Sequence, residues 1–238
     1  MTDEIALSVE NLKTFFYTNK RCNKAVNGVS FNIKKGKTLC VVGESGCGKS
    51  VTASTIMQLL PTLSRIEEGS VTYHSDRGDI RIDELPRDGS EMRRIRGSEI
   101  SMIFQDPMTA LNPVYTIGFQ IAESLQYHTD LNSSEIKARV IELLTDMGIP
   151  LPEQRAEEYP HNFSGGMRQR AMIAMAMSCN PKILIADEPT TALDVTIQAQ
   201  IFGLMDKLKS EHHTAIMLIT HDMGVVAELA DEVAVMYM

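Results

Sequence analysis

Short apolar runs recur along the chain and alternate with stretches of helical periodicity. The runs at residues 39–42, 183–186, 216–220 and 233–237 contain few charged side chains. Such runs are typical of parallel strands that are buried on both faces. After Asp194, a plausible helix cap, apolar residues recur at helical spacing and predict one apolar helix face: Ile197, Ile201, Leu204, Met205 and Leu208. This alternation predicts an α/β fold.

Residues 107–160 follow a different pattern. They show no clear strand, and helical stretches are predicted near residues 117–127 and 134–147. We therefore expect a discontinuous α/β core, formed by residues 1–104 and 162–238, with a helical subdomain inserted at residues 105–161.

Residues 69–97 are polar and rich in glycine, which predicts a hairpin with a long exposed turn. Within this segment, Arg93, Arg94 and Arg96 form a basic cluster, which we expect to be a solvated surface.

Composition narrows the possible functions. With 238 residues, of which 43% are hydrophobic, the chain can bury a substantial core. A net charge of -8 disfavours nucleic-acid binding, which depends on Lys and Arg. No long apolar run and no signal-peptide pattern are found, so we expect a cytosolic chain that reaches a membrane through partners. The four cysteines lack CxxC spacing, which favours free thiols over disulfides or a zinc site.

A phosphate-binding loop follows the first apolar run. The segment GESGCGKS lies between an expected strand and an expected helix and consists of Gly43, Glu44, Ser45, Gly46, Cys47, Gly48, Lys49 and Ser50. Its glycines let backbone N–H groups point at phosphate oxygens, and the helix N-terminus favours negative charge. Lys49 would reach the β- and γ-phosphates, and Ser50 would bind Mg²⁺.

Two carboxylates follow the second apolar run. Asp187 and Glu188 come directly after the run at residues 183–186, at the edge where α/β sheets bind ligands. Asp187 suits a ligand for Mg²⁺, and Glu188 suits a general base that orients the attacking water. Taken alone, the pair is usually a solvated strand end, but the phosphate loop favours the catalytic interpretation.

A third motif, FSGGM, precedes a helical run that ends before Pro181. Ser164 can cap this helix, and the small residues Gly165 and Gly166 in its first turn leave room for an anion.

These motifs together resemble the ATP-binding cassette (ABC) family. The signature motif of that family is most often LSGGQ, and this sequence has FSGGM in its place. The resemblance spans nearly the whole chain. It implies that Gln105 senses Mg²⁺ and the γ-phosphate, that residues 191–194 with Asp194 form the D-loop, and that His221 is the switch histidine. Phe16 occupies the approximate place of the aromatic residue that stacks on adenine, although Phe15 and Tyr17 are adjacent.

The family implies a P-loop NTPase (RecA-like) core with an ABC-type β subdomain and an inserted α-helical subdomain. Within the family, FQDPMTALNP, FSGGMRQR and ADEPTTALDVTIQAQI are similar to ATPase subunits of dipeptide, oligopeptide and nickel importers. Those subunits usually continue past the last apolar run into a C-terminal extension, and the sequence stops before it.

The resemblance implies that ATP and Mg²⁺ bind between two ATP-binding subunits, each contributing half of a site. Identical and different second subunits both remain open. The further expected partners are transmembrane permeases and, indirectly, a solute-binding protein, which would hold the chain at the cytoplasmic face of the membrane.

Three alternatives are open, two from other classes of protein and one among transporters. A soluble ABC ATPase that remodels nucleic acid or ribosomes usually carries two cassettes or a long coiled-coil insertion. A non-catalytic regulator would be expected to lack Glu188 or His221, and both are present. An exporter shares the chemistry, so only the subfamily wording favours import, and it leaves the solute open.

Overall fold

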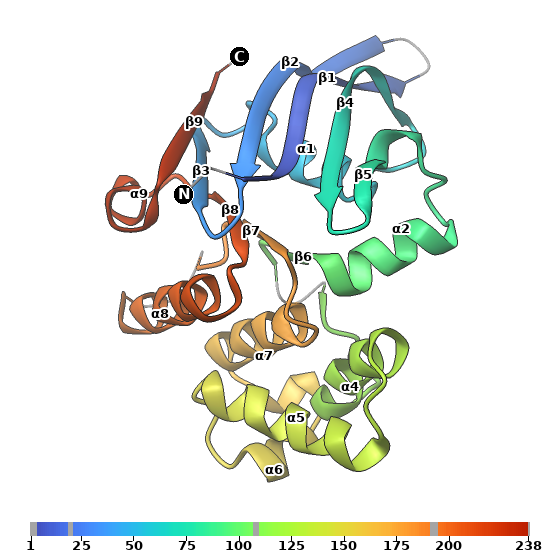
Figure 1. Ribbon diagram of the computed structural model, residues 1–238. Coiled ribbons are helices and arrows are strands. Elements are labelled where there is room, and N and C mark those ends of the chain that lie inside the picture. The colour runs from blue at the N-terminus through green and yellow to red at the C-terminus, as the bar shows by residue number, and fades with distance from the viewer. Residues whose placement is uncertain (1–3, 19–20, 107–109, 191–194, 238) are drawn as a thin grey trace.

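The computed structural model describes residues 4–18, 21–106, 110–190 and 195–237 and contains two sheets (Figure 1). One is a 4-stranded sheet in the order β2-β1-β4-β5, and the other is a 5-stranded sheet in the order β6-β7-β8-β3-β9. Their strands are β1 (Ile5–Thr18), β2 (Arg21–Lys34), β3 (Thr38–Gly43), β4 (Ser64–Ser75), β5 (Gly78–Arg81), β6 (Ile100–Ile103), β7 (Ile183–Asp187), β8 (Ala215–Ile219) and β9 (Glu232–Met236).

The 5-stranded sheet is parallel and contains all four strands that the apolar runs predict. These runs form β3, β7, β8 and β9, and β3 pairs with both β8 and β9. Every residue of β7 and β8 is buried, in accordance with a sheet covered on both faces. The α/β prediction is therefore confirmed. The short strand β6 completes the sheet beside β7.

The 4-stranded sheet is antiparallel and includes the predicted hairpin, but the long exposed turn is wrong. Ser75 pairs with Gly78, so only two residues connect β4 to β5. The polar segment beyond β5 is mostly helical and comprises η1 (Ile82–Glu84), α2 (Ser90–Arg94) and η2 (Ile95–Glu99). Ile82, Met92 and Ile95 anchor it in the core, each at 0% exposure.

The arginine cluster is only partly the solvated surface that its sequence predicts. Arg93 is exposed. Arg94 forms ion pairs with Glu91 and Glu99, and Arg96 donates to backbone carbonyls, including that of Met57 at 2.9 Å. Arg96 therefore fastens the segment after β5 to the end of α1, whereas Arg94 links residues within the segment.

The predicted helical stretches are α4 (Ile117–His128) and α5 (Ser133–Asp146), followed by α6 (Pro152–Ala156) and η3 (Pro160–Asn162). Thr116 caps α4, and Asn132 forms a capping box with Glu135 at the start of α5. These helices lie at the end of the molecule away from the antiparallel sheet (Figure 1). The division at residues 104/105 and 161/162 remains a prediction.

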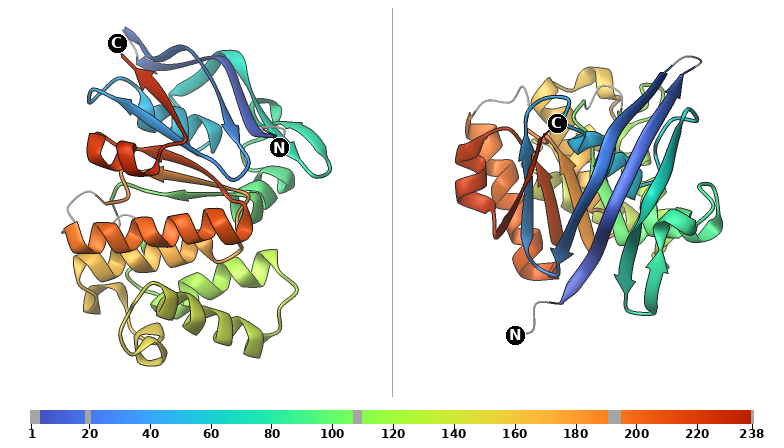
Figure 2. Two further views of the ribbon diagram at one scale, coloured as in Figure 1. Left: turned by 60° about the vertical axis from the view of Figure 1, so that its left-hand side comes forward. Right: turned by 90° about the horizontal axis from the view of Figure 1, so that it is seen from above.

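The other helices are α1 (Lys49–Ile56), α7 (Gly165–Met177), α8 (Val195–His212) and α9 (Met223–Leu229). Figure 2 shows α7 and α8 along one face of the parallel sheet and the antiparallel sheet beyond the other. The two faces carry separate hydrophobic clusters, because alternate strand residues point to opposite sides. None of the described helices combines the length and apolar composition needed to cross a membrane.

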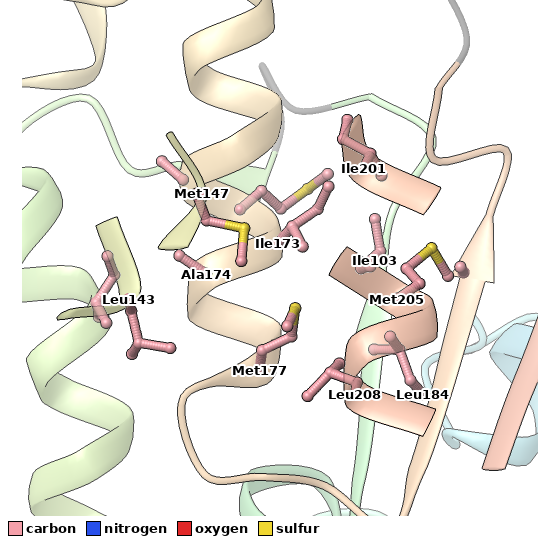
Figure 3. Packing of buried hydrophobic residues seen from close by; sticks show 14 of the residues in the cluster. Ile103, Leu143, Met147, Ile173, Ala174, Met177, Leu184, Ile201, Met205 and Leu208 are labelled. Atoms are coloured by element: carbon pink, nitrogen blue, oxygen red, sulfur yellow. The ribbon is translucent and has the colours of Figure 1, made fainter. Parts of the chain in front are cut away.

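The cluster beneath α7 and α8 links the sheet to the helical end of the chain. Leu184 from β7, Met205 from α8, Met177 from α7 and Leu143 from α5 share it (Figure 3). The methionines of α7 therefore fill a core, since Met172 is 1% exposed and Met177 is 6% exposed.

Candidate nucleotide site

The phosphate loop connects β3 to α1, and two of its glycines are required by the backbone. Gly43 has φ 152, and a Cβ there would lie 2.1 Å from the Met236 carbonyl oxygen. Gly48, the N-cap of α1, has φ 98, and a Cβ there would lie 2.3 Å from the Ala25 carbonyl oxygen. Any larger residue at either position would displace backbone and distort the loop.

Lys49 is turned into the loop. It is 7% exposed, and its Nζ donates to the carbonyl oxygens of Gly43 at 2.7 Å and Glu44 at 3.0 Å. The Cys47 Sγ lies 3.8 Å from the same nitrogen. The loop therefore encloses a positive charge, which is the charge that a phosphate requires.

Ser50 and Asp187 meet beside the loop. The Ser50 Oγ donates to the Asp187 Oδ1 at 3.0 Å. Asp187 is 5% exposed, and burial raises the pKa of its carboxyl, an effect that the Ser50 hydrogen bond opposes and the charge of Glu188 reinforces.

This oxygen pair fits Mg²⁺. Mg²⁺ is typically held by one or two protein oxygens together with water and substrate phosphates. In the described part of the chain, no cluster of three or more His, Cys, Asp or Glu side chains suits a metal ion. A cation here would therefore share its coordination with a bound phosphate.

Two candidate catalytic side chains, Gln105 and His221, contact a third, Glu188. The Gln105 Nε2 donates to the Glu188 Oε2 at 2.9 Å, and the His221 Nδ1 lies 3.2 Å from the Glu188 Oε1. Gln105, Glu188 and His221 follow β6, β7 and β8, which are neighbours in the sheet. Because parallel strands end at a common edge, the strand order alone brings together residues from distant parts of the sequence.

A cavity of about 1040 Å³ extends from the loop to the antiparallel sheet. Its lining includes Ser45, Lys49, Ser50, Gln105 and Glu188, together with Phe16 of β1 and residues 23–31 of β2. This volume is at the upper limit of the range of about 300–1,000 Å³ that is typical of small-molecule sites.

Only one of the three adjacent aromatic residues of β1 lines this cavity. Phe16 does so, whereas the Lys24 ammonium lies 5.5 Å from the centre of the Phe15 ring. The Tyr17 hydroxyl donates to Glu67 at 2.7 Å on the antiparallel sheet. Strand alternation separates Phe16 from its two neighbours.

The FSGGM motif begins α7. Ser164 caps this helix, and its Oγ accepts a hydrogen bond from the Met167 N–H at 3.3 Å. Ser164 and Gly165 are exposed, and a Cβ at Gly165 would meet nothing within 4 Å. Ser164, Gly165 and Gly166 do not line the cavity that contains Lys49. One chain therefore does not bring the two predicted phosphate contacts together, and predicted Asp194 lies outside the described residues.

Sequence reasoning missed Gln169 and the cavity wall formed by β2. Gln169, which is 2% exposed, donates from its Nε2 to the Pro189 carbonyl oxygen, next to Glu188. The signal that could have identified Gln169 is a polar residue within a buried helical stretch, because a buried polar side chain requires a hydrogen-bond partner. The mixed polarity of residues 23–31 carried no such signal.

The ABC transporter family model matches residues 26–191 of this chain. The dipeptide transport ATP-binding protein DppD of Bacillus subtilis is 52% identical over 98% of this chain and 68% of its own length. The oligopeptide transport ATP-binding protein AppD of Bacillus subtilis is 53% identical over 97% of this chain and 69% of its own.

The solved structures include a dimer of the ATP-binding cassette MJ0796 in a post-hydrolysis state with bound ADP and Pi. It matches with a TM-score of 0.84 and 29% identity, covering 97% of this chain and 94% of that one. The family match and the two relatives agree with this fold. The chain belongs to the ABC transporter family, as one of its ATP-binding cassettes.

Proposed function

We propose that this ATPase powers the uptake of peptides, or of a related small solute, through partner permeases. The observation that carries the ATPase chemistry is the meeting of Gln105, Glu188 and His221 beside the cavity that contains Lys49. The names of DppD and AppD support peptides as the cargo.

The phosphate loop binds the nucleotide. Its N–H groups and the Lys49 ammonium hold the β- and γ-phosphates, and Phe16 stacks on the adenine. Ser50 and Asp187 hold Mg²⁺, which when bound neutralises the charge that develops on the phosphates. Lys49 and Ser50 exchange their present partners, the loop carbonyls and Asp187, for these ligands.

Glu188 then acts on water. Its carboxylate orients the attacking water and accepts its proton, while Gln105 and His221 hold the carboxylate from either side. Because both side chains contact Glu188, loss of the γ-phosphate would change their hydrogen bonds together with those of the carboxylate.

Two chains complete each site. The helix end formed by Ser164, Gly165 and Gly166 receives the γ-phosphate bound by the partner chain. This arrangement explains why the FSGGM motif lies outside the cavity of its own chain. The dimeric ATP-binding cassette found among the solved structures supports it.

The shared site can be tested by complementation. Lys49→Ala disables the phosphate loop, and Ser164→Arg blocks the anion-receiving helix end. Each variant alone should be inactive, whereas a mixture contains heterodimers with one intact composite site and should regain hydrolysis. If the variants pair but the mixture stays inactive, titration of parent chain decides: suppression of its turnover indicates obligate coupling, and simple addition contradicts the shared site.

The helices α4 to α6 dock the permease at the cytoplasmic face of the membrane. Exposed aromatic side chains support this surface, because Tyr115 and Phe119 stack at 4.8 Å with exposures of 47% and 46%. The surface also follows Gln105 in the chain, so closure around ATP can be passed to the permease.

The cargo is tested in the assembled transporter. The chain is purified with its permeases, and ATP hydrolysis is measured with binding proteins loaded with different solutes. Stimulation by a peptide-loaded binding protein is expected. Stimulation only by nickel or another solute would replace the peptide assignment, and activity that never responds to a permease would favour a soluble ABC ATPase.

A further inference from the structure

The backbone at Glu188 is held in an unusual conformation. Its φ is 47, in the left-handed region that side chains with a Cβ rarely adopt. The next residue is Pro189, whose ring further restricts the residue before it. Such a conformation persists only when surrounding contacts determine it, and the direction of the Glu188 carboxylate depends on it.

Two hydrogen bonds fix the backbone on either side of this position. The Glu188 N–H donates to the Ile219 carbonyl oxygen of β8 at 3.0 Å. On the other side, the Pro189 carbonyl oxygen accepts from the Gln169 side chain. Proline has no N–H of its own, so it cannot be held through a backbone donor.

Gln169 is built to make this contact. It lies in the second turn of α7 and is 2% exposed, so its amide is removed from water. The next residue fastens the same helix further: the Arg170 Nη1 donates to the carbonyl oxygens of Met147 at 3.1 Å and Gly148 at 3.0 Å. The donor therefore stands on a fixed helix rather than on a loop.

We propose that Gln169 is a positioning residue for hydrolysis, which through Pro189 keeps the Glu188 carboxylate of its own chain in reach of the attacking water. The inference rests on the proposed role of Glu188. Gln169 does not line the cavity and acts through Pro189, so it affects turnover rather than ATP binding.

The first test separates turnover from binding. Gln169→Met keeps the length of the side chain but removes the donor. It should lower kcat by about ten- to hundredfold, since a small misplacement of a catalytic group has effects of this size, and change the Kd for ATP by less than about twofold. Gln154→Met is the matched control, because Gln154 is an exposed glutamine that bonds only locally to Glu158 in the described structure. An unchanged kcat in Gln169→Met would overturn the proposal.

The second test uses low pH to restore a hydrogen-bond donor to the side chain at position 169. In Gln169→Glu, burial raises the pKa of the new carboxyl, and only its protonated form can donate to Pro189. The ratio of variant kcat to parent kcat should therefore rise as the pH falls from about 8.5 to about 6, whereas the ratio for Gln169→Met should stay flat. Parallel profiles would mean that Gln169 only packs the helix. This comparison also decides the matter if Gln169→Met does not fold, with the parent as reference.

The third test asks which chain is affected. In the complementing mixture, the intact site takes Glu188 from the Ser164→Arg chain and the helix end from the Lys49→Ala chain. Gln169→Met added to the Ser164→Arg chain should lower the regained hydrolysis by the same factor as in the first test, and the same change in the Lys49→Ala chain should spare it. The reverse result would place Gln169 in the FSGGM end instead. If the mixture without the Gln169 change fails to complement, titration of parent chain separates obligate coupling from a self-contained site, and the two kinetic tests still decide the role of Gln169.

Discussion

The Ser50 hydroxyl donates to the Asp187 carboxylate at 3.0 Å and so joins the first turn of α1 to the last residue of β7. The hydrogen bond lowers the pKa of Asp187, but burial raises it more strongly. The folded protein thus holds this carboxylate at a free-energy cost that a bound cation would reduce.

Asp187→Asn should stabilise the nucleotide-free protein. A carboxyl whose pKa is raised on folding binds more protons when folded, so stability falls as the pH rises through the unfolded value toward the folded one. Above this pH range the amide of the variant avoids the free-energy cost of burying the carboxylate charge. The melting temperature at pH 7 should therefore rise by about 2–4 °C for each kcal/mol of stability regained. Thermal unfolding with and without ATP and Mg²⁺ measures both effects, because the added stability from the ligands should be lost. A lower melting temperature of the nucleotide-free variant would contradict the prediction.

Lys49→Ala should weaken ATP binding. The ammonium is buried within the loop, and a hydrogen bond from a charged donor contributes about 1.5–3 kcal/mol, which corresponds to a rise in Kd of roughly 10- to 100-fold. Calorimetric titration with ATP measures this directly. Lys24→Ala, which removes a second lysine from the cavity wall, is the control and should have a smaller effect. Equal affinities of the Lys49 variant and the parent would refute the loop assignment.

Glu188→Gln should trap bound ATP. The amide keeps the shape of the side chain but cannot accept a proton, so turnover should fall by about 10²- to 10⁴-fold while ATP still binds. Size-exclusion chromatography should then show a dimer that persists with ATP. Parental turnover would remove Glu188 from the catalytic role, and loss of ATP binding would assign it a structural one.

Tyr115→Glu and Phe119→Glu should uncouple transport from hydrolysis. A charge on the exposed aromatic pair disrupts an apolar contact with the permease but lies outside the residues that line the cavity. Transport into vesicles should be lost and basal ATPase activity retained. Leu63→Glu places the same charge on an exposed apolar residue of the antiparallel sheet end and should leave transport intact. Unimpaired transport after a scan of residues 110–127 would exclude this surface.

Local patterns in the sequence determined the elements that carry the nucleotide chemistry. The apolar runs predicted β3, β7 and β8 because buried parallel strands need continuous hydrophobic residues. The fourth run also forms a strand, β9, but it lies at the sheet edge, where Val233 and Val235 are 49% and 66% exposed. The glycines before Lys49 predicted the loop, since only they permit its backbone, and Ser164 predicted the start of α7. These signals depend on neighbours in sequence and can be read without a fold.

Sequence by itself did not predict β1 and β2, because one face of each lies against the core and the other faces solvent or the cavity, which gives mixed polarity. It also left Phe15, Phe16 and Tyr17 equivalent. Their difference depends on which face of β1 meets the cavity, and the pairing of β1 with β2 and β4 sets this.

The catalytic contacts were decided by tertiary structure alone. Gln105 contacts Glu188, and Gln169 contacts Pro189, but no pattern in the sequence between them predicts either contact. The order of β6, β7 and β8 brings the first pair to one sheet edge, and the packing of α7 on the parallel sheet brings the second together. A side chain's type is local information, whereas its partner depends on how whole strands and helices pack.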